Sequence, residues 1–223
     1  MSFFETLQQR TEGPRNGLQQ QAFIQRGVSG ELSTADYIAF LSQAYHHVKH
    51  TVPLLMACGA KLPERYEWLR VAVAEYIEEE TGHQEWILND IAAAGGDAEA
   101  VRCSSPNAST ELMVAYAYDM IQRVNPLGFF GMVQVLEGTS IAVADAAADA
   151  IQGSLGLPNR AFSYLKSHGA LDIEHVDFFK GLMNQVTDTQ DQACIIHSAT
   201  RFYQLYGGIF EELDRGADYR LAA

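Results

Sequence analysis

Three residues with metal-binding side chains fall on the apolar face of one expected helix. His168, Asp172 and His175 form the pattern HxxxDxxH, and helical spacing places them on one side of the helix. Burying two imidazoles and a carboxylate costs several kcal/mol unless each finds a partner. The pattern therefore predicts either a metal site or a hydrogen-bonded core network. The apolar members of the same face are Leu165, Phe179, Leu182 and Val186.

A second helix, opened by Pro63, repeats this feature with Glu80 and His83. Glu80 lies within roughly 30° of the centre of the apolar face and Glu79 about 70° away, so Glu80 is the better inward candidate. Glu80-x-x-His83 puts a carboxylate and an imidazole one turn apart, where both can reach one ion. The rest of the face consists of Leu69, Ala72, Val73, Tyr76 and Ile87.

Two further helices each contribute one candidate. Glu137 is the only charged residue between Pro126 and Ala144, and a carboxylate in such a stretch needs a cation or a hydrogen-bond partner. The partner could instead be a local hydroxyl such as Ser140. His47 lies on the flank of an apolar face and is a possible ligand or supporting group, whereas its neighbours His46 and His50 are expected on the surface. That face comprises Tyr37, Phe40, Leu41, Ala44, Val48, Thr51 and Leu55.

Together these residues resemble the ligand set of a di-iron carboxylate bundle. Such bundles use one carboxylate from each of two helices and an acidic-x-x-His pair from each of two others. Glu80 with His83 and Asp172 with His175 supply both pairs, and Glu137 supplies one single carboxylate. The place of the other carboxylate could be filled by His47 or His168. Mixed oxygen and nitrogen ligands suit iron or manganese, and we expect Glu137 to face the same ion as His83.

The elements that carry these residues are all helical. Sustained alternation of apolar and polar residues, the signal of strands, is nearly absent. Caps and breakers predict about seven helices in one all-α bundle, a single domain over residues 1–223 whose N-terminal ~30 and C-terminal ~10 residues are peripheral. The expected helices are a weak one before Gly27 and then 34–57 with a kink at Pro53, 63–94, 109–124, 126–152, 158–186 and 188–213.

Composition limits the partners. The chain of 223 residues carries 28 Asp and Glu against 15 Lys and Arg, a net charge of −13. So acidic a surface repels phosphate backbones and anionic lipid, which argues against nucleic-acid and membrane partners. Three cysteines without CxxC spacing indicate a reducing compartment. The sequence shows neither a signal peptide nor an apolar run of bilayer length, so a cytoplasmic protein is expected.

The segments YIEEETGHQEWILND and HGALDIEH, with the apolar helix that bears Glu137, resemble the haem-oxygenase-like superfamily. That superfamily includes thiaminase-like (TenA-like) salvage enzymes and the pyrroloquinoline quinone synthesis enzyme. The resemblance covers about residues 34–213 and is closest to the di-iron oxidase branch of iron-containing redox enzymes. It implies six metal ligands, namely Glu80, His83, Glu137, His168, Asp172 and His175. Where some members of that branch carry a further Glu, this chain has Tyr76 and His47.

The same resemblance implies a non-haem oxidoreductase with one or two iron ions, or manganese, and O₂ as co-substrate. Its substrate would be a small amine, amino acid or fatty-acid-like molecule, and Tyr76 would support the ligands or act as a redox-active phenol. A homodimer is also expected. The segments around the site supply a candidate substrate pocket of Phe129, Phe130, Met132, Phe179, Met183, Tyr203 and Tyr206.

Other functions remain open within this fold. Haem ligation is disfavoured because no histidine precedes His46, and thiaminase chemistry because the helix with Glu137 lacks a cysteine. A cofactor-free enzyme of the thiaminase-like or quinone-synthesis type is one alternative. A non-catalytic protein that binds a small ligand or acts as a regulator is the other.

Overall fold

The part of the chain that the structure describes is predominantly helical. This computed structural model describes the backbone of residues 1–221 and, within them, the side chains outside 141, 167–175 and 217–221. No strand occurs in residues 1–221, so the expected all-α class is confirmed. The α-helices are α1 (Phe3–Arg10), α2 (Glu12–Gln19), α3 (Ala22–Val28), α4 (Thr34–Val48), α5 (Thr51–Lys61), α6 (Glu67–Glu80), α7 (His83–Ala93), α8 (Ala98–Arg102), α9 (Ala108–Asp119), α10 (Phe129–Leu155), α11 (Ser163–Gln185) and α12 (Thr189–Leu221).

The described residues thus form twelve α-helices, where about seven were expected. One extra break divides the helix expected over 34–57 at Lys49 and His50, where α4 ends and α5 begins. Pro53 lies in the first turn of α5 and cannot bond back to the carbonyl of Lys49. The proline therefore starts a new helix after the break and does not kink a continuous one.

A second break divides the helix expected over 63–94. Thr81 and Gly82 separate α6 from α7, and Gly82 has a φ of 99°. Only glycine adopts this left-handed conformation without a steric penalty. The Glu80-x-x-His83 pair consequently spans a turn between two helices and does not lie on one helix.

The remaining differences concern helix ends. The N-terminal segment forms three helices, α1 to α3, in place of one. Asn107, and not Ser109, caps α9, because its side chain accepts a hydrogen bond from the amide of Thr110 at 2.8 Å. The last helix continues to Leu221, beyond the expected end at Leu213.

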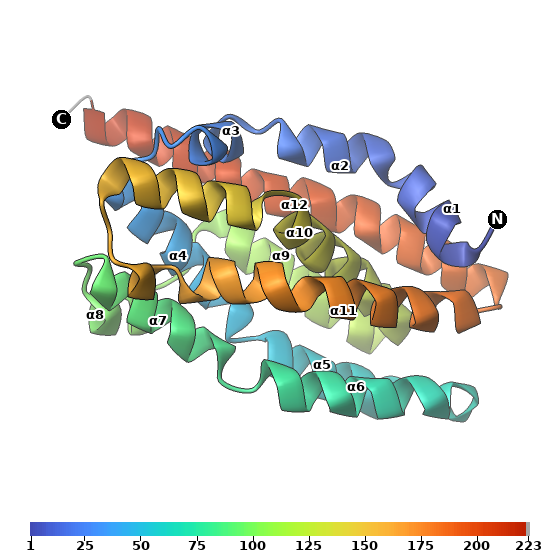
Figure 1. Cartoon of the computed structure of the whole chain (residues 1–223). Coiled ribbons are helices and arrows are strands. Elements are labelled where there is room, and N and C mark those ends of the chain that lie inside the picture. The colour runs from blue at the N-terminus through green and yellow to red at the C-terminus, as the bar shows by residue number, and fades with distance from the viewer. Residues whose placement is uncertain (222–223) are drawn as a thin grey trace.

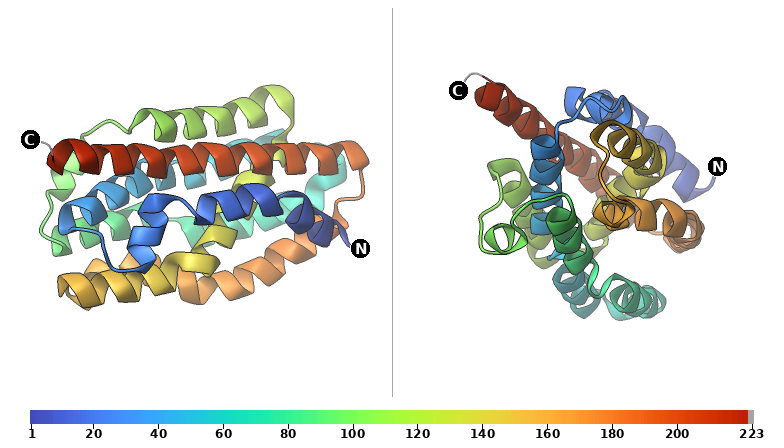
Figure 2. Two further views of the ribbon diagram at one scale, coloured as in Figure 1. Left: turned by 90° about the horizontal axis from the view of Figure 1, so that it is seen from above. Right: turned by 60° about the vertical axis from the view of Figure 1, so that its left-hand side comes forward.

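The long helices pack side by side (Figure 1). α12 runs the length of the bundle, with α9 along one side of it and α1 to α3 along the other (Figure 2). α10 packs against both α11 and α12, α4 packs against α7, and α5 and α6 form an antiparallel pair. The core between them is apolar, and its largest fully buried side chains include Tyr37, Phe130, Phe162, Phe179 and Phe202.

A glycine allows α10 and α12 to approach closely. A Cβ atom at Gly131 would lie 2.1 Å from the hydroxyl oxygen of Ser198 and 2.5 Å from the amide nitrogen of Ala199. The Ser198 hydroxyl also donates a hydrogen bond of 2.7 Å to the carbonyl of Gly128. These contacts fix the first turns of α10, and therefore the position of Glu137 two turns later.

Helix α10 bends after Glu137. The segments Pro126–Ser140 and Ala142–Leu155 meet at an angle of 42°. The Thr139 hydroxyl donates to the carbonyl of Val135 at 2.6 Å, a back-bond that often bends helices. Within the described residues, no single helix combines the length and apolarity needed to cross a membrane, although these two segments meet those criteria as a bent pair.

Helix α11, which carries the HxxxDxxH pattern, is fixed at its start by a residue of α7. The fully buried carboxylate of Asp90 accepts hydrogen bonds from the amides of Ser163 and Tyr164, at 3.0 and 2.8 Å. Asp90 thus satisfies the first amides of α11 as a capping side chain would. Burial raises the pKa of Asp90, and the bonds from Tyr164 and Ser163 oppose that rise.

Candidate metal and substrate site

A cavity of about 710 Å³, open solvent at its mouth included, lies between α4, α5, α6, α10 and α11. We call it the polar cavity, because three ionisable residues predicted from the sequence, His47, Glu80 and Glu137, line it together with Tyr76. Residues far apart in the sequence therefore meet at one place. The other lining residues are Val48, Thr51, Leu54, Leu55, Phe129, Met132, Val133, Leu136, Ser140 and Tyr164.

Tyr76 and Glu137 interact across this cavity. Burial raises the pKa of the Tyr76 phenol above its usual range, and Glu137 raises it further by its charge and by a hydrogen bond. The phenol therefore stays protonated and can donate to the carboxylate. The Tyr76 ring also packs on the ring of Phe178 in α11, with centroids 5.4 Å apart.

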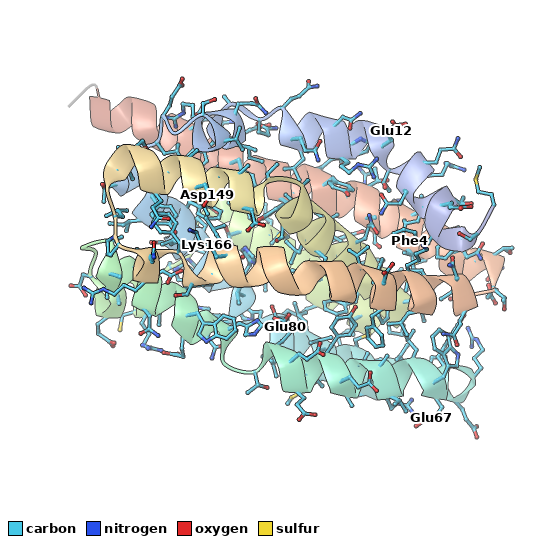
Figure 3. All side chains as sticks on the ribbon, viewed as in Figure 1. Phe4, Glu12, Glu67, Glu80, Asp149 and Lys166 are labelled. Carbon is cyan, nitrogen blue, oxygen red and sulfur yellow. The ribbon has the colours of Figure 1, made fainter. Side chains whose placement is uncertain are left out.

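Glu80 and His83 meet across the turn between α6 and α7. The Oε2 atom of Glu80 lies 3.0 Å from Nδ1 of His83, and both side chains are largely buried. Glu79 is exposed, so the choice of Glu80 as the inward-facing residue agrees with the structure. Figure 3 places Glu80 at the break between the two helices. The His83 ring stacks on Trp86, with centroids 4.1 Å apart, and does not itself line the polar cavity.

The histidines of α4 differ from expectation in one respect. His47 is buried on the polar cavity, where its ring meets Tyr206 edge-on with centroids 5.9 Å apart. His46, expected on the surface, is 1% exposed. Its Nε2 atom lies 2.9 Å from the Ser104 hydroxyl, so the loop after α8 covers a side chain that the helix alone would leave exposed. Burial lowers the pKa of His46 to about 4, with further contributions from Lys49 and His50.

The three candidates of the HxxxDxxH pattern, His168, Asp172 and His175, have side chains outside the described residues, so their roles stay predictions. Described residues of α11 nevertheless lie on both sides of them in the sequence. Tyr164, before them, lines the polar cavity, and Phe178, after them, contacts Tyr76. Among side chains that the structure does describe, no group of three or more His, Cys, Asp or Glu is arranged to hold a metal ion.

Of the seven residues expected to line a substrate pocket, three line a cavity and four do not. Phe129 and Met132 line the polar cavity, and Tyr206 lines a neighbouring cavity described below. The others are buried in the core and line neither of these two cavities: Phe130, Phe179, Met183 and Tyr203.

Sequence reasoning did not identify Tyr164 or Asp90. Tyr164 reaches the cavity because of how α11 packs on α10, which no local pattern shows. Asp90 lies next to Ile91, a residue on the apolar face of its helix. A carboxylate in such apolar surroundings is the same kind of sequence signal that identifies Glu137.

The sequence identifies the family. Residues 38–207 match the family of iron-containing redox enzymes, and the chain belongs to that family. No curated protein matches the sequence significantly.

Solved structures show the haem-oxygenase-like fold that the sequence segments suggested. A domain of unknown function with that fold from Shewanella denitrificans is 24% identical, with a TM-score of 0.86 over 98% of this chain and 94% of that one. A TenA homologue from Pseudomonas syringae is 12% identical, with a TM-score of 0.81 over 96% and 93%. Haem oxygenase-1 from the cyanobacterium Synechocystis, solved with haem, is 11% identical, with a TM-score of 0.77 over 100% and 96%.

Proposed function

We propose that this protein is a non-haem iron oxidoreductase that uses O₂ to oxidise a small molecule bound in the polar cavity. The observation that carries the proposal is the meeting of Glu80 and Glu137, from α6 and α10, on one cavity in a member of the iron-containing redox enzyme family. The sequence alone predicts both residues as metal ligands.

The donor chemistry at this place fits iron. Two carboxylates line the cavity, and the His83 imidazole contacts one of them; mixed oxygen and nitrogen donors suit iron or manganese. The proposed ligands are Glu80, His83, Glu137, His168, Asp172 and His175, with His47 as a further ligand or supporting group. When bound, one or two iron ions would supply the redox chemistry with O₂ that no side chain can provide.

The chain's own groups position the ligands and exclude water. The Tyr76 phenol, kept protonated by burial and by the charge of Glu137, can donate a hydrogen bond to that carboxylate and so restrict how it turns. The contact between Glu80 and Nδ1 of His83 orients the imidazole, as carboxylates do for metal-binding histidines. Apolar side chains such as Leu54, Phe129 and Met132 form much of the remaining wall.

Iron binding provides the first test. Purified protein is reconstituted anaerobically with ferrous iron, desalted and analysed for metal, and O₂ uptake is then recorded. We expect about one to two iron ions per chain. Glu80→Ala and Asp172→Ala should lose iron while staying folded by circular dichroism, and Glu79→Ala, which alters the exposed neighbour of Glu80, should retain it.

Two results would contradict the proposal. Wild-type protein that takes up no iron under these conditions would not be an iron enzyme. An Asp172→Ala variant that stays fully loaded with iron but loses stability would make Asp172 part of a core network.

A covalent thiaminase-like route is less well supported. Burial raises the pKa of the Cys58 thiol to about 12, so the thiolate that a nucleophilic cysteine needs is scarce at neutral pH.

Further parts of the proposal are a cytoplasmic homodimer and a small amine, amino acid or fatty-acid-like substrate. Light scattering of the purified protein tests the dimer directly.

A further inference from the structure

A second cavity lies beside the polar cavity, and we call it the apolar cavity. It measures about 630 Å³, open solvent included, and is bounded by α3, α4, α10, α11 and α12. Thr139, Ser140 and the tyrosine hydroxyls are its only polar lining groups among the described side chains. Its lining residues are Phe23, Ile24, Gly27, Leu32, Phe40, Thr139, Ser140, Val143, Ala144, Ala147, Ile151, Tyr164, Leu165, Tyr206 and Phe210.

The two cavities share a wall. Ser140 of α10 and Tyr164 of α11 line both of them. Ser140 lies at the 42° bend of α10, where the segment ending at Ser140 meets the segment that begins at Ala142. The boundary between the cavities is therefore the place where α10 changes direction.

One face of α10 continues from the first cavity into the second. Positions 129, 132, 133, 136, 137 and 140 line the polar cavity, and 139, 140, 143, 144, 147 and 151 line the apolar one. These spacings of three and four residues describe a single helix face. Along that face the side chains change from a carboxylate at Glu137 to small and aliphatic groups at Val143, Ala144 and Ala147.

We propose that the two cavities form one binding site for an amphiphile with a single aliphatic chain. Its polar end would lie in the polar cavity beside Glu80 and Glu137, and its chain would pass Ser140 and Tyr164 into the apolar cavity. The inference rests on the proposed function only for the chemistry at the polar end.

The apolar lining explains why a chain is the fitting occupant. The described lining residues of the apolar cavity include no ionisable group other than tyrosine, so a charged end placed there would be desolvated without a partner. An aliphatic chain needs no polar partner there and gains by leaving water. Affinity should then rise about fourfold for each added methylene until the cavity is filled.

The test measures binding of a series of 1-alkanols, from butanol to decanol, by isothermal titration calorimetry. Their uncharged hydroxyl avoids simple ion pairing with the carboxylates. The variant Ala147→Phe places a ring in the apolar cavity, and Ala146→Phe makes the same change at an adjacent exposed residue that does not line it. Circular dichroism and thermal melts check that both fold, and Val143→Phe serves as a second variant that narrows the cavity.

We expect the wild type and Ala146→Phe to show the steep dependence on chain length. Ala147→Phe or Val143→Phe should bind butanol nearly as before and lose at least tenfold in affinity for octanol. An equally steep dependence in the variants that fill the apolar cavity, or no dependence in the wild type, would overturn the inference.

Iron content measured on the same samples separates this inference from the proposed function. Iron-loaded protein without any chain-length dependence contradicts only the two-cavity site. Protein that binds no iron and yet shows the dependence, together with its loss in Ala147→Phe, contradicts only the iron enzyme.

Discussion

The carboxylate of Glu80, the last residue of α6, lies 3.0 Å from Nδ1 of His83, the first residue of α7. One helix therefore ends, and the next begins, at a candidate ligand. The turn between them allows the two side chains to meet without lying on one helix face. Because Gly82 has a φ of 99°, the geometry of this pair depends on a residue that is not itself a candidate ligand.

Replacing Gly82 by alanine tests that dependence. A Cβ atom there meets no atom within 4 Å, so the cost comes from the left-handed backbone alone, roughly 1–2 kcal/mol of unfolding free energy. Urea unfolding should show this loss, and iron affinity should fall because the Glu80–His83 pair is displaced. Gly153→Ala, at a helical glycine with open space around it, should instead stabilise by about 0.4–1 kcal/mol. Equal changes in unfolding free energy for the two substitutions would show that a side chain at position 82 does not strain the turn.

Tyr76→Phe removes the protonated hydroxyl that lies near Glu137 and can donate to its carboxylate. Groups that orient metal ligands typically contribute 10–100-fold to metal affinity, so we expect a loss in about that range with the helical spectrum unchanged. Competition with a chelator measures it. Tyr118→Phe, which removes a phenol that contacts His50 and does not line the polar cavity, is the control. Unchanged iron affinity in Tyr76→Phe would remove Tyr76 from the site.

The stability of the protein should depend on His46 in mild acid. Burial, with Lys49 and His50, lowers the pKa of His46 from 6.5 to about 4, so the folded state favours the neutral ring. The stability linked to this group is present above about pH 6.5 and is lost as the pH falls toward 4. Urea unfolding at pH 7.5 and pH 5 should show a larger loss in the wild type than in His46→Gln. The same loss in both proteins would assign the acid sensitivity to other groups.

Asp90 should hold the start of α11, and through it the HxxxDxxH segment. Asp90→Ala leaves the amides of Ser163 and Tyr164 without their acceptor, at a cost of about 1–3 kcal/mol. Their hydrogen exchange should accelerate, and Asp90→Asn should restore part of the protection. Asp97→Ala, which removes the exposed cap of the short helix α8, should cost less. Unchanged exchange at Ser163 and Tyr164 in Asp90→Ala would show that α11 is held by packing alone.

The all-α class and the inward direction of Glu80 could be predicted because both follow from local spacing. Apolar periodicity marks a helix face, and Glu80 fell near its centre while Glu79 did not. The burial of His46 could not be read in this way, because the segment that covers it includes Ser104, far along the chain.

The two helix breaks could be predicted only in part from the sequence. Gly82 is an isolated glycine in a helical pattern, which the helix could have tolerated. Its left-handed φ belongs to the turn that leads from α6, packed on α5, to α7, packed on α4. Pro53 predicts a kink in the helix expected over 34–57, but its place in the first turn of a new helix depends on the break at Lys49 and His50. The shared wall of the two cavities depends on the bend of α10 and on the packing of α11, which are properties of the assembled bundle.

Anomalous X-ray diffraction at the iron absorption edge, from crystals of the anaerobically reconstituted protein, tests the central claim most directly. The account predicts an iron peak in the polar cavity within bonding distance, ~2.0–2.2 Å, of the Glu137 carboxylate. His83 and residues of the HxxxDxxH segment of α11 should bind the same centre. Iron bound elsewhere, or a Glu137 that points away from the ion and from His83 in the loaded crystal, would contradict it.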